Sequence, residues 1–536
     1  MARLAAIDIG SNAIRLRIAE VDPPAVTPVG PRFSPFRDVL SDRAAVRLGH
    51  DVFTKGRLEG GVIGAACEAL KRFRTAMDAA KVDRYRAVAT SAARESSNGD
   101  VLVERAEREA GVHVEVIEGV EEARLVQLAV TERVVLGSRT ALLVDVGGGS
   151  TELTLLQGER TVFSQSCPVG TVRLIEAFLE GGRAIDGVHQ RLIEEYVDRA
   201  IADAVRDIDE AAGGRIDLLI GTGGNIETLA DLCPLSKAFP EGRAIDVPRM
   251  GYLLGELRKK TVDERVVAFN LRPDRADTIV PAATVLARVA GAFGFGAIAA
   301  PGVGLKEGVL VDLARQHFMP TDDRGITSAV MDACSRLGRR YHFDEQHGVQ
   351  VSRFAVKLFD DLLPRHRLST RDRLLLSAAA MLHDIGDFIR YEGHHKHSYY
   401  LIAHSDVMGL SPLEREIVAN IARYHRKSPP SLEHENFRAL SREDRGKVKA
   451  LAAILRIADA LDREHRAKIG DIANRIEGDT LVIEAHGTED RTLEEWTVLA
   501  KSGMLREALG LDVRIADPSS KPAPSRRKGS TPPITS

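Results

Sequence analysis

The 536-residue chain contains only four cysteines, and no two of them form a CxxC pair. Cysteines scattered in this way are typical of a reducing compartment and argue against a disulfide framework or a zinc knuckle. The chain also lacks an excess of charge, because 74 Lys and Arg face 77 Asp and Glu and leave a net charge of −3. A general nucleic-acid or lipid-headgroup surface is therefore not expected, and an anionic ligand needs a local site.

Long apolar runs are absent as well, since nowhere do 18 uncharged apolar residues follow one another. The sequence thus contains no candidate membrane span. Its apolar start is interrupted by Asp8 and followed by Arg15 and Arg17, which is unlike a secretory signal peptide. We therefore expect a cytoplasmic protein. The length is too great for one core and predicts three or four domains.

The first half of the chain alternates short apolar runs with amphipathic stretches, which predicts an α/β domain with a mixed sheet covered on both faces. The predicted strands are Leu4–Ile9, Ala13–Ala19, Ala87–Thr90, Val112–Ile117, Ala141–Val146, Glu152–Leu156 and Ile216–Ile220. The predicted helices are Gly61–Met77, Asp100–Glu109, Glu121–Val130 and Ile193–Asp209.

Two segments of this half repeat one pattern. Leu4–Ile18 and Ala141–Leu155 each contain an apolar strand ending in Asp, a turn of Gly, Ser or Asn, and a second β-rich run. A hairpin used twice indicates a duplicated domain, with halves at residues 1–130 and 131–315.

The pattern changes after residue 324. Long helical periodicities predict an all-α domain at residues 325–465, and a small α+β segment follows at 466–516, with LVIEAHG (481–487) and WTVLAKS (496–502) as its clearest β-like pieces. Residues 517–536 are rich in Pro, Ser, Lys and Arg and predict a disordered tail.

Three turns of small residues follow predicted strands and are typical of phosphate binding. Such turns let backbone N–H groups approach a phosphate without hindrance from side chains. Asp8 and Asp145 end the first two strands, where a carboxylate can hold Mg²⁺ or a water beside the phosphate. The candidate phosphate-binding residues are Gly10, Ser11, Asn12, Gly147, Gly148, Gly149, Ser150, Thr151, Gly223, Gly224 and Asn225.

The motifs DIGSN (8–12), DVGGGSTE (145–152) and GTGGN (221–225) resemble the acetate and sugar kinase, heat-shock ATPase and actin superfamily. Two more, ATSAARE (89–95) and VIEGVEEARL (116–125), narrow the resemblance to the exopolyphosphatase/guanosine pentaphosphate phosphohydrolase family, Ppx/GppA. The resemblance covers residues 4–310 and implies two ribonuclease-H-like lobes.

The resemblance also implies roles for single residues. Glu122 would be the general base that deprotonates the attacking water, and Arg94 would neutralise the terminal phosphate. Asp145 and Glu152, with Asp8, would hold Mg²⁺. Lys306 stands where the family usually has Arg in a GLREG-like turn, which keeps the charge but gives up bidentate binding.

The helical domain is similar to the HD metal-dependent phosphohydrolases. The resemblance rests on His383 and Asp384 in MLHDIG, with His347 upstream and Asp459 downstream. It implies a site for Mn²⁺ or another divalent metal. Two further histidines, His397 and His425, fall where two-metal relatives have ligands.

The function that follows is Mg²⁺-dependent hydrolysis of the terminal phosphoanhydride of inorganic polyphosphate. Three alternatives stay open: a guanosine pentaphosphate 5′-phosphohydrolase at the same site, a nucleotide phosphohydrolase in the HD-like domain, and a non-catalytic sensor of alarmone or polyphosphate. The expected partners are polyphosphate and guanosine penta- or tetraphosphate, with neither nucleic acid nor membrane. The family also implies a homodimer.

Overall fold

The structure is a computed structural model, and it describes residues 1–27, 30–33, 35–179, 182–235, 239, 242–319, 324–487 and 490–516. The chain divides into two compact units, residues 1–325 and 326–536. The predicted tail at 517–536 lies outside the described residues. Among the described residues, no helix combines the length and the apolar character needed to cross a membrane.

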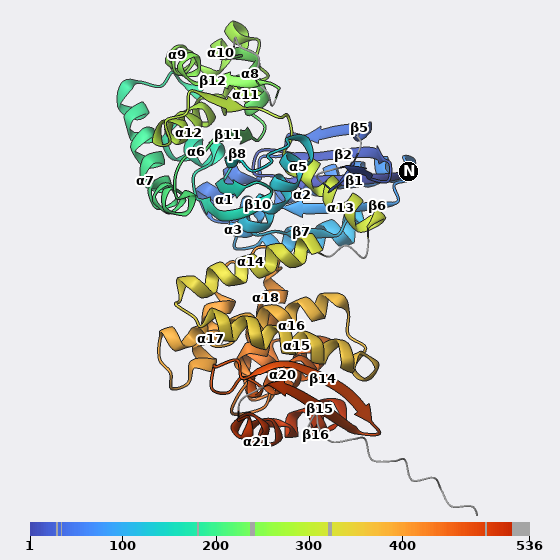
Figure 1. Ribbon diagram of the computed structural model, residues 1–536. Helices are drawn as coiled ribbons and strands as arrows, with labels where there is room; N and C mark the ends of the chain where they lie inside the picture. Colours follow the sequence, from blue (N-terminus) through green and yellow to red (C-terminus); the bar gives the residue numbers. More distant parts are fainter. Residues whose placement is uncertain are drawn as a thin grey trace, which may run out of the picture. The chain divides into compact units, whose positions relative to one another are not determined.

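The first unit contains two mixed sheets (Figure 1). The first sheet has the order β5-β2-β1-β6-β7 and the second has the order β10-β9-β8-β11-β13-β12. The strands of the first sheet are β1 (Ala2–Ile9), β2 (Ile14–Val21), β5 (Arg37–Ala44), β6 (Arg84–Ala89) and β7 (Val114–Val116), and β3 (Ala25–Thr27) pairs with β4 (Gly30–Arg32) in a separate hairpin. The strands of the second are β8 (Thr140–Val146), β9 (Thr151–Gln157), β10 (Arg160–Cys167), β11 (Leu218–Thr222), β12 (Ala244–Asp246) and β13 (Ala297–Ala299).

The two sheets are built in the same way. In each, the first strand pairs antiparallel with the second and parallel with the fourth, while the third lies at the far edge. The predicted duplication is therefore present in the strand order, and the arrangement fits an actin-like α/β fold. Alternate residues of β1 enter different cores, because Ala5 and Ile7 pack in one cluster and Leu4 and Ala6 in another. The first sheet is thus covered on both faces, as predicted.

Helices separate the strands of this unit. They are α1 (Leu48–Lys55), α2 (Gly60–Ala79), α3 (Ser91–Glu95), α4 (Gly99–Arg105), α5 (Gly119–Arg133), α6 (Thr171–Phe178), α7 (Gly187–Ala212), α8 (Ile226–Leu232), α9 (Val247–Arg258), α10 (Val262–Phe269), α11 (Pro273–Ala276), α12 (Ile279–Ala292) and α13 (Leu305–Phe318). The predicted helix Asp100–Glu109 is α4 continued by a π-helical turn, Ala106–Ala110.

Two differences from the sequence-based prediction have simple causes. The edge strand β5 was not predicted because it is largely exposed and charged, so it shows no apolar alternation. In addition, α13 packs its apolar side on strand β1 of the first sheet and on helix α5. It does so although it follows the last strand of the second sheet in the chain. The end of the predicted second half therefore contributes to the core of the first.

The second unit is helical, with a three-stranded sheet in the order β14-β15-β16 (Figure 1). Its elements are α14 (Arg324–Arg340), α15 (Glu345–His366), α16 (Thr370–Leu382), a 3₁₀ turn (Ile385–Phe388), α17 (His394–Ala403), α18 (Pro412–Arg423), α19 (Glu435–Arg438), α20 (Arg442–Ala460), β14 (Ile469–Glu477), β15 (Thr480–Gly487), α21 (Thr492–Lys501), α22 (Gly503–Leu509) and β16 (Asp512–Ala516). The run LVIEAHG forms most of β15, but WTVLAK belongs to the helix α21. The small segment packs on the helical part, because α20 contacts both α21 and α22.

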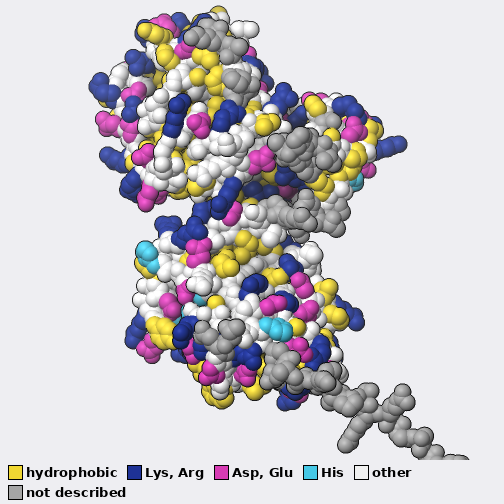
Figure 2. Space-filling model, in the orientation of Figure 1, with side chains coloured by type: hydrophobic (Ala, Val, Ile, Leu, Met, Phe, Trp, Pro, Cys, Tyr) yellow, Lys and Arg dark blue, Asp and Glu magenta, His cyan; other side chains and the backbone are white. Residues whose placement is uncertain are grey.

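Charges of both signs are mixed on the surface. On the face shown in Figure 2, Lys and Arg side chains alternate with Asp and Glu side chains on each unit. This mixture agrees with the net charge of −3.

Candidate active site

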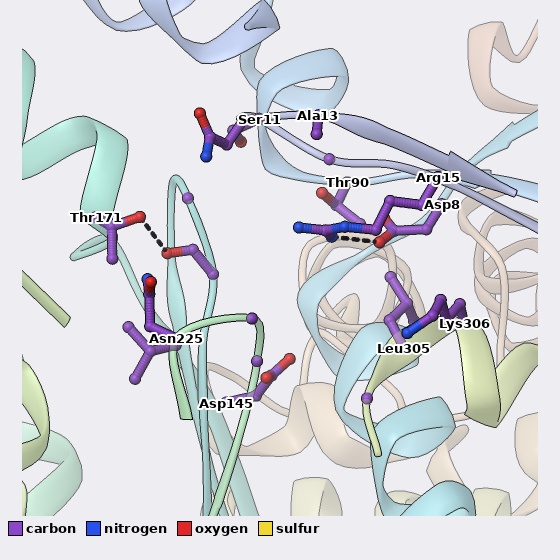
Figure 3. A pocket seen from close by; sticks show the side chains of 18 of the residues that line it. Asp8, Ser11, Ala13, Arg15, Thr90, Asp145, Thr171, Asn225, Leu305 and Lys306 are labelled. Carbon is purple, nitrogen blue, oxygen red and sulfur yellow. Dashed lines mark hydrogen bonds and ion pairs between the residues drawn. The ribbon is translucent and has the colours of Figure 1, made fainter. Parts of the chain in front are cut away.

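A cavity of about 160 Å³ lies where the small-residue turns of both sheets meet (Figure 3). The turns after β1, β8 and β11 contribute to it, together with the beginning of α13. Strand order explains why the turns after β8 and β11 meet, because these two strands are parallel neighbours and their carboxyl ends lie at one edge of the second sheet. The residues predicted from sequence that line the cavity are Asp8, Gly10, Ser11, Asn12, Glu122, Asp145, Gly147, Gly148, Gly223, Gly224, Asn225 and Lys306.

The first two turns close in the same way. The Gly10 N–H donates to the Ala13 carbonyl at 3.1 Å, and the Gly147 N–H donates to the Ser150 carbonyl at 3.0 Å. The duplication therefore extends to the hydrogen bond that shapes each turn. Ser11 is fixed further by a hydrogen bond of 3.0 Å between its hydroxyl and that of Ser91.

Three predicted phosphate-binding residues do not line the cavity. The Ser150 hydroxyl donates to Glu152 Oε1 at 2.6 Å, and the Thr151 hydroxyl donates to the Val169 carbonyl. Gly149 is in close contact with Ser91, whose Oγ would lie 2.3 Å from an added Cβ. These three residues shape the turn and its surroundings. The hydroxyls of Ser150 and Thr151 already donate hydrogen bonds within the protein, so they cannot donate to a phosphate.

The third turn depends on glycine. Gly223 has φ +97°, and a Cβ there would lie 2.7 Å from the Val146 carbonyl oxygen. At Gly224 an added Cβ would lie 2.5 Å from the guanidinium of Arg275. Both positions allow a close approach of other groups that a side chain would prevent.

Three carboxylates are buried together beside this turn. Glu122 and Asp145 are each 6% exposed and Glu152 is 1% exposed, and ligand oxygens of all three lie within 4.8 Å of one another. Asp145 Oδ1 accepts a hydrogen bond of 2.7 Å from Thr222. Within the described part of the chain, Glu122 Oε2 and Glu152 Oε2 have no hydrogen-bond partner.

Burial, with repulsion from at least one neighbouring carboxylate, raises the pKa of each of these carboxyls. Burial raises the pKa of Asp145 to about 6, and burial with the charge of Asp145 raises the pKa of Glu152 to about 7. The pKa of Glu122 lies well above its ordinary value because of burial and the charges of Glu152 and Asp145. Crowded, unpartnered carboxylate oxygens fit a hard divalent cation such as Mg²⁺, which takes oxygen ligands.

Asp8 lies at the cavity but has a different partner. Its Oδ2 accepts a hydrogen bond of 3.0 Å from Arg15 Nη1, as Figure 3 shows. Of the three predicted Mg²⁺ ligands, the structure thus places Asp145 and Glu152 in one cluster and completes that cluster with Glu122.

Two cationic residues of the cavity were missed. Arg15 and Arg275 line it alongside the predicted Lys306. Arg15 could have been found, since it follows the DIGSN turn and faces Asp8 across the hairpin. Arg275 belongs to no motif, and burial together with the charge of Arg15 lowers its pKa to about 10.

Arg94 does not line the cavity. Its Nη1 donates to the Ile117 carbonyl at 2.6 Å, and its Nε lies 3.7 Å from Glu118 Oε2. Its charge nevertheless lowers the pKa of Glu122, so it lies close enough to influence that carboxylate.

Most of the predicted histidine and aspartate set comes together inside the second unit. His347, His383, Asp384, His425 and Asp459 form overlapping groups of potential ligands. The prediction for His397 is not supported, because the ligand group contains His394 in its place. His465 joins the cluster as well and was also missed.

Comparisons with known proteins find relatives over most of the chain. The model of the Ppx/GppA phosphatase family matches residues 26–317, and the model of Ppx/GppA phosphatase domain III matches residues 331–507. A guanosine-5′-triphosphate,3′-diphosphate pyrophosphatase of Aeromonas hydrophila is 25% identical over 461 residues, which cover 85% of this chain and 86% of that protein. The protein of the same name from Vibrio vulnificus is 24% identical over 501 residues, covering 91% and 93%.

Solved structures resemble the chain in the same way. An exopolyphosphatase from Cytophaga hutchinsonii is 28% identical with a TM-score of 0.50, covering 58% of this chain and 97% of its own. An exopolyphosphatase-like protein is 26% identical with a TM-score of 0.51, covering 59% and 100%. Since one family model alone spans more than half of the sequence, the chain belongs to the Ppx/GppA phosphatase family.

Proposed function

We propose that the first unit hydrolyses the terminal phosphoanhydride bond of linear inorganic polyphosphate and releases orthophosphate. The observation that carries the proposal is the buried, incompletely hydrogen-bonded Glu122 beside a cavity bordered by glycine turns and cationic side chains. Phosphoryl transfer depends mainly on positioning and electrostatic stabilisation, which such a cavity can supply.

The cationic residues Arg15, Arg275 and Lys306 bind the charged end of the chain, and the glycine turns leave room for the phosphate close to the backbone. Glu122 orients a water and accepts its proton. The water oxygen bonds to the terminal phosphorus while the bridging P–O bond breaks, and its electron pair stays on the shortened polyphosphate.

Asp145 and Glu152 hold Mg²⁺ in this proposal. The fit rests on their burial, their raised pKa values and the unpartnered oxygen of Glu152. When bound, the cation neutralises phosphate charge and keeps the surrounding carboxyls ionised. Glu122 can then act as a base near neutral pH.

Guanosine pentaphosphate is the second candidate substrate, with loss of its 5′ γ-phosphate at the same site. It is favoured by the names of the relatives from Aeromonas hydrophila and Vibrio vulnificus, which match 85% and 91% of this chain. The terminal phosphate would contact the same residues in either substrate. The homodimer implied by the family stays a prediction.

The test is Mg²⁺-dependent orthophosphate release from long-chain polyphosphate and, separately, from guanosine pentaphosphate. We expect Glu122→Gln to reduce release from polyphosphate by about 100-fold or more, the range for loss of a general base. Glu107→Gln, a change at an exposed helical position, is the matched control and should leave release unchanged.

Each other outcome is informative. Release from guanosine pentaphosphate alone would favour the second candidate, and tight binding of polyphosphate without release would indicate a sensor. Release that survives Glu122→Gln but is lost in His383→Ala would place the chemistry in the second unit.

A further inference from the structure

We propose that Glu307 competes with phosphate for the ammonium group of Lys306 and so weakens the retention of the orthophosphate product. The inference rests on the proposed function, because it assumes that Lys306 binds a phosphate in the first unit. Both residues line the cavity, and Figure 3 shows Lys306 at the beginning of α13. A carboxylate beside an anion site needs a reason, since it repels a phosphate.

Lys306 already has an anionic partner in the free protein. Its Nζ lies 2.8 Å from Glu307 Oε1, and the two side chains are 30% and 13% exposed. A phosphate that binds Lys306 must displace this carboxylate or share the ammonium with it. Sharing is unfavourable, because it would hold two like charges close together away from bulk water.

Glu307 is the fixed partner of the pair. Its Oε1 also accepts a hydrogen bond of 3.0 Å from Arg17 Nη1, and its Oε2 accepts one of 2.9 Å from the Gly304 N–H in the turn before α13. Arg17 is itself held in β2, where its Nε donates to Asp38 at 2.7 Å. The carboxylate is thus tied both to the first sheet and to the beginning of α13.

Lys306 is the partner that can exchange. Lysine carries a compact charge on a flexible four-carbon stem, so its ammonium can leave one anion for another with small movements of the side chain. An arginine at this position would bind a phosphate through two parallel hydrogen bonds and would release it less easily. The lysine of this chain therefore suits a residue that alternates between Glu307 and a phosphate.

The competition affects the product more than the substrate. Arg15 and Arg275 also line the cavity and continue to attract orthophosphate after the bond is cleaved. Product release limits turnover in many enzymes. A polyphosphate chain has further phosphates that can contact the protein, whereas orthophosphate has only one. Losing part of the attraction of Lys306 therefore weakens the binding of orthophosphate by a larger share.

The test measures the Kd of inorganic phosphate for the full chain in Mg²⁺ by titration calorimetry. Glu307→Gln removes the charge and keeps an oxygen that can accept from the Gly304 N–H. We expect this variant to bind orthophosphate about 3- to 5-fold more tightly, the factor that corresponds to a partly exposed ion pair. The constant for product inhibition should fall by the same factor. Structural damage would weaken binding instead.

Two controls separate competition from a general change of charge. Glu227→Gln removes a carboxylate from the same cavity without breaking the pair of Lys306 and Glu307, and it should change the Kd less than about 2-fold. In the Lys306→Met background, the gain from Glu307→Gln should also shrink below about 2-fold, because no ammonium remains to compete for.

An unchanged Kd in Glu307→Gln would overturn the inference, and so would an equal gain in the Lys306→Met background or a parent that binds no orthophosphate. Melting temperatures show whether the variants fold. A crystal structure of the parent with orthophosphate tests the exchange without any substitution: the Lys306 ammonium should contact the phosphate and not Glu307, and the reverse would contradict the inference. Binding of orthophosphate without hydrolysis of either substrate would contradict the proposed function alone.

Discussion

Arg15 and Asp8 face each other across the first hairpin, and Arg15 Nη1 donates to Asp8 Oδ2 at 3.0 Å. Both side chains line the cavity, so this pair places a positive charge next to the candidate phosphate site. Arg15 also keeps Asp8 paired, whereas Glu122 Oε2 and Glu152 Oε2 have no hydrogen-bond partner among the described residues.

We expect Arg15→Met to raise the KM for polyphosphate by about 10- to 100-fold, because a hydrogen bond to a charged group contributes about 1.5 to 3 kcal/mol. Arg3→Met is the matched control, since Arg3 pairs with Glu20 across the same two strands but does not line the cavity. Steady-state rates of orthophosphate release give the KM of both variants. A KM within 3-fold of the parent value would contradict a role of Arg15 in substrate binding.

Two glycines should respond differently to alanine. At Gly224 the added methyl would lie 2.5 Å from the guanidinium at the end of the long Arg275 side chain, whereas at Gly308 it would lie 1.9 Å from the Leu125 carbonyl oxygen. We expect Gly224→Ala to weaken substrate binding with little loss of stability. We expect Gly308→Ala to lower the free energy of unfolding by about 1 to 3 kcal/mol or more, because the new methyl group can be accommodated only if the backbone of α5 or α13 shifts.

Denaturant unfolding and KM measurements separate these two effects. Gly64→Ala is the control, because Gly64 also lies inside a helix and a Cβ there would have no neighbour within 4 Å. It should be neutral or slightly stabilising. Equal losses of stability in the three variants would show that the close approach at Gly308 has no special importance.

Asp312 joins the buried Arg124 and the half-buried Arg86. Its carboxylate accepts hydrogen bonds of 3.0 Å from both Arg86 and Arg124. Asp312→Asn should lower the free energy of unfolding by about 1.5 to 3 kcal/mol, because it weakens hydrogen bonds to two guanidinium groups. Glu121 still pairs with both arginines, so neither charge is left without a carboxylate partner. Asp198→Asn, which breaks the surface pair with Arg288, should cost about 1 kcal/mol or less. Similar losses in the two variants would argue against a buried network.

The contribution of Asp145 and Glu152 to the stability of the metal-free protein should fall as pH rises from about 4 to about 7. The pKa values of Asp145 and Glu152 are raised to about 6 and about 7 in the folded state, from 3.8 and 4.5. The folded state therefore binds more protons than the unfolded state in this window, and it loses that advantage as the carboxyls ionise. The difference in melting temperature between the parent and Asp145→Asn/Glu152→Gln across this range measures the effect.

Mg²⁺ should counteract this loss, since it binds the ionised carboxylates. We expect it to raise the melting temperature more at pH 8 than at pH 5, and Asp145→Asn/Glu152→Gln to remove the difference. The same Mg²⁺ shift at both pH values would contradict a cation site at these residues.

The sequence by itself determined the features that depend on neighbours along the chain. The turns of DIGSN and DVGGGSTE are closed by hydrogen bonds three residues apart, and the strands before them are continuous apolar runs. Residue type and spacing along the chain determine local geometry of this kind. The duplication and the position of Asp145 could therefore be predicted from the residues, whereas the role of Glu122 came from the resemblance to the Ppx/GppA family.

Only the tertiary structure decided which distant groups meet. Arg275 belongs to no motif and reaches the cavity because Gly224, in another turn, leaves room for its guanidinium. His394 and His397 lie one turn apart in α17, and the packing of that helix beside Asp384 selects His394. Contacts of this kind depend on how whole elements pack, which spacing along the chain does not encode.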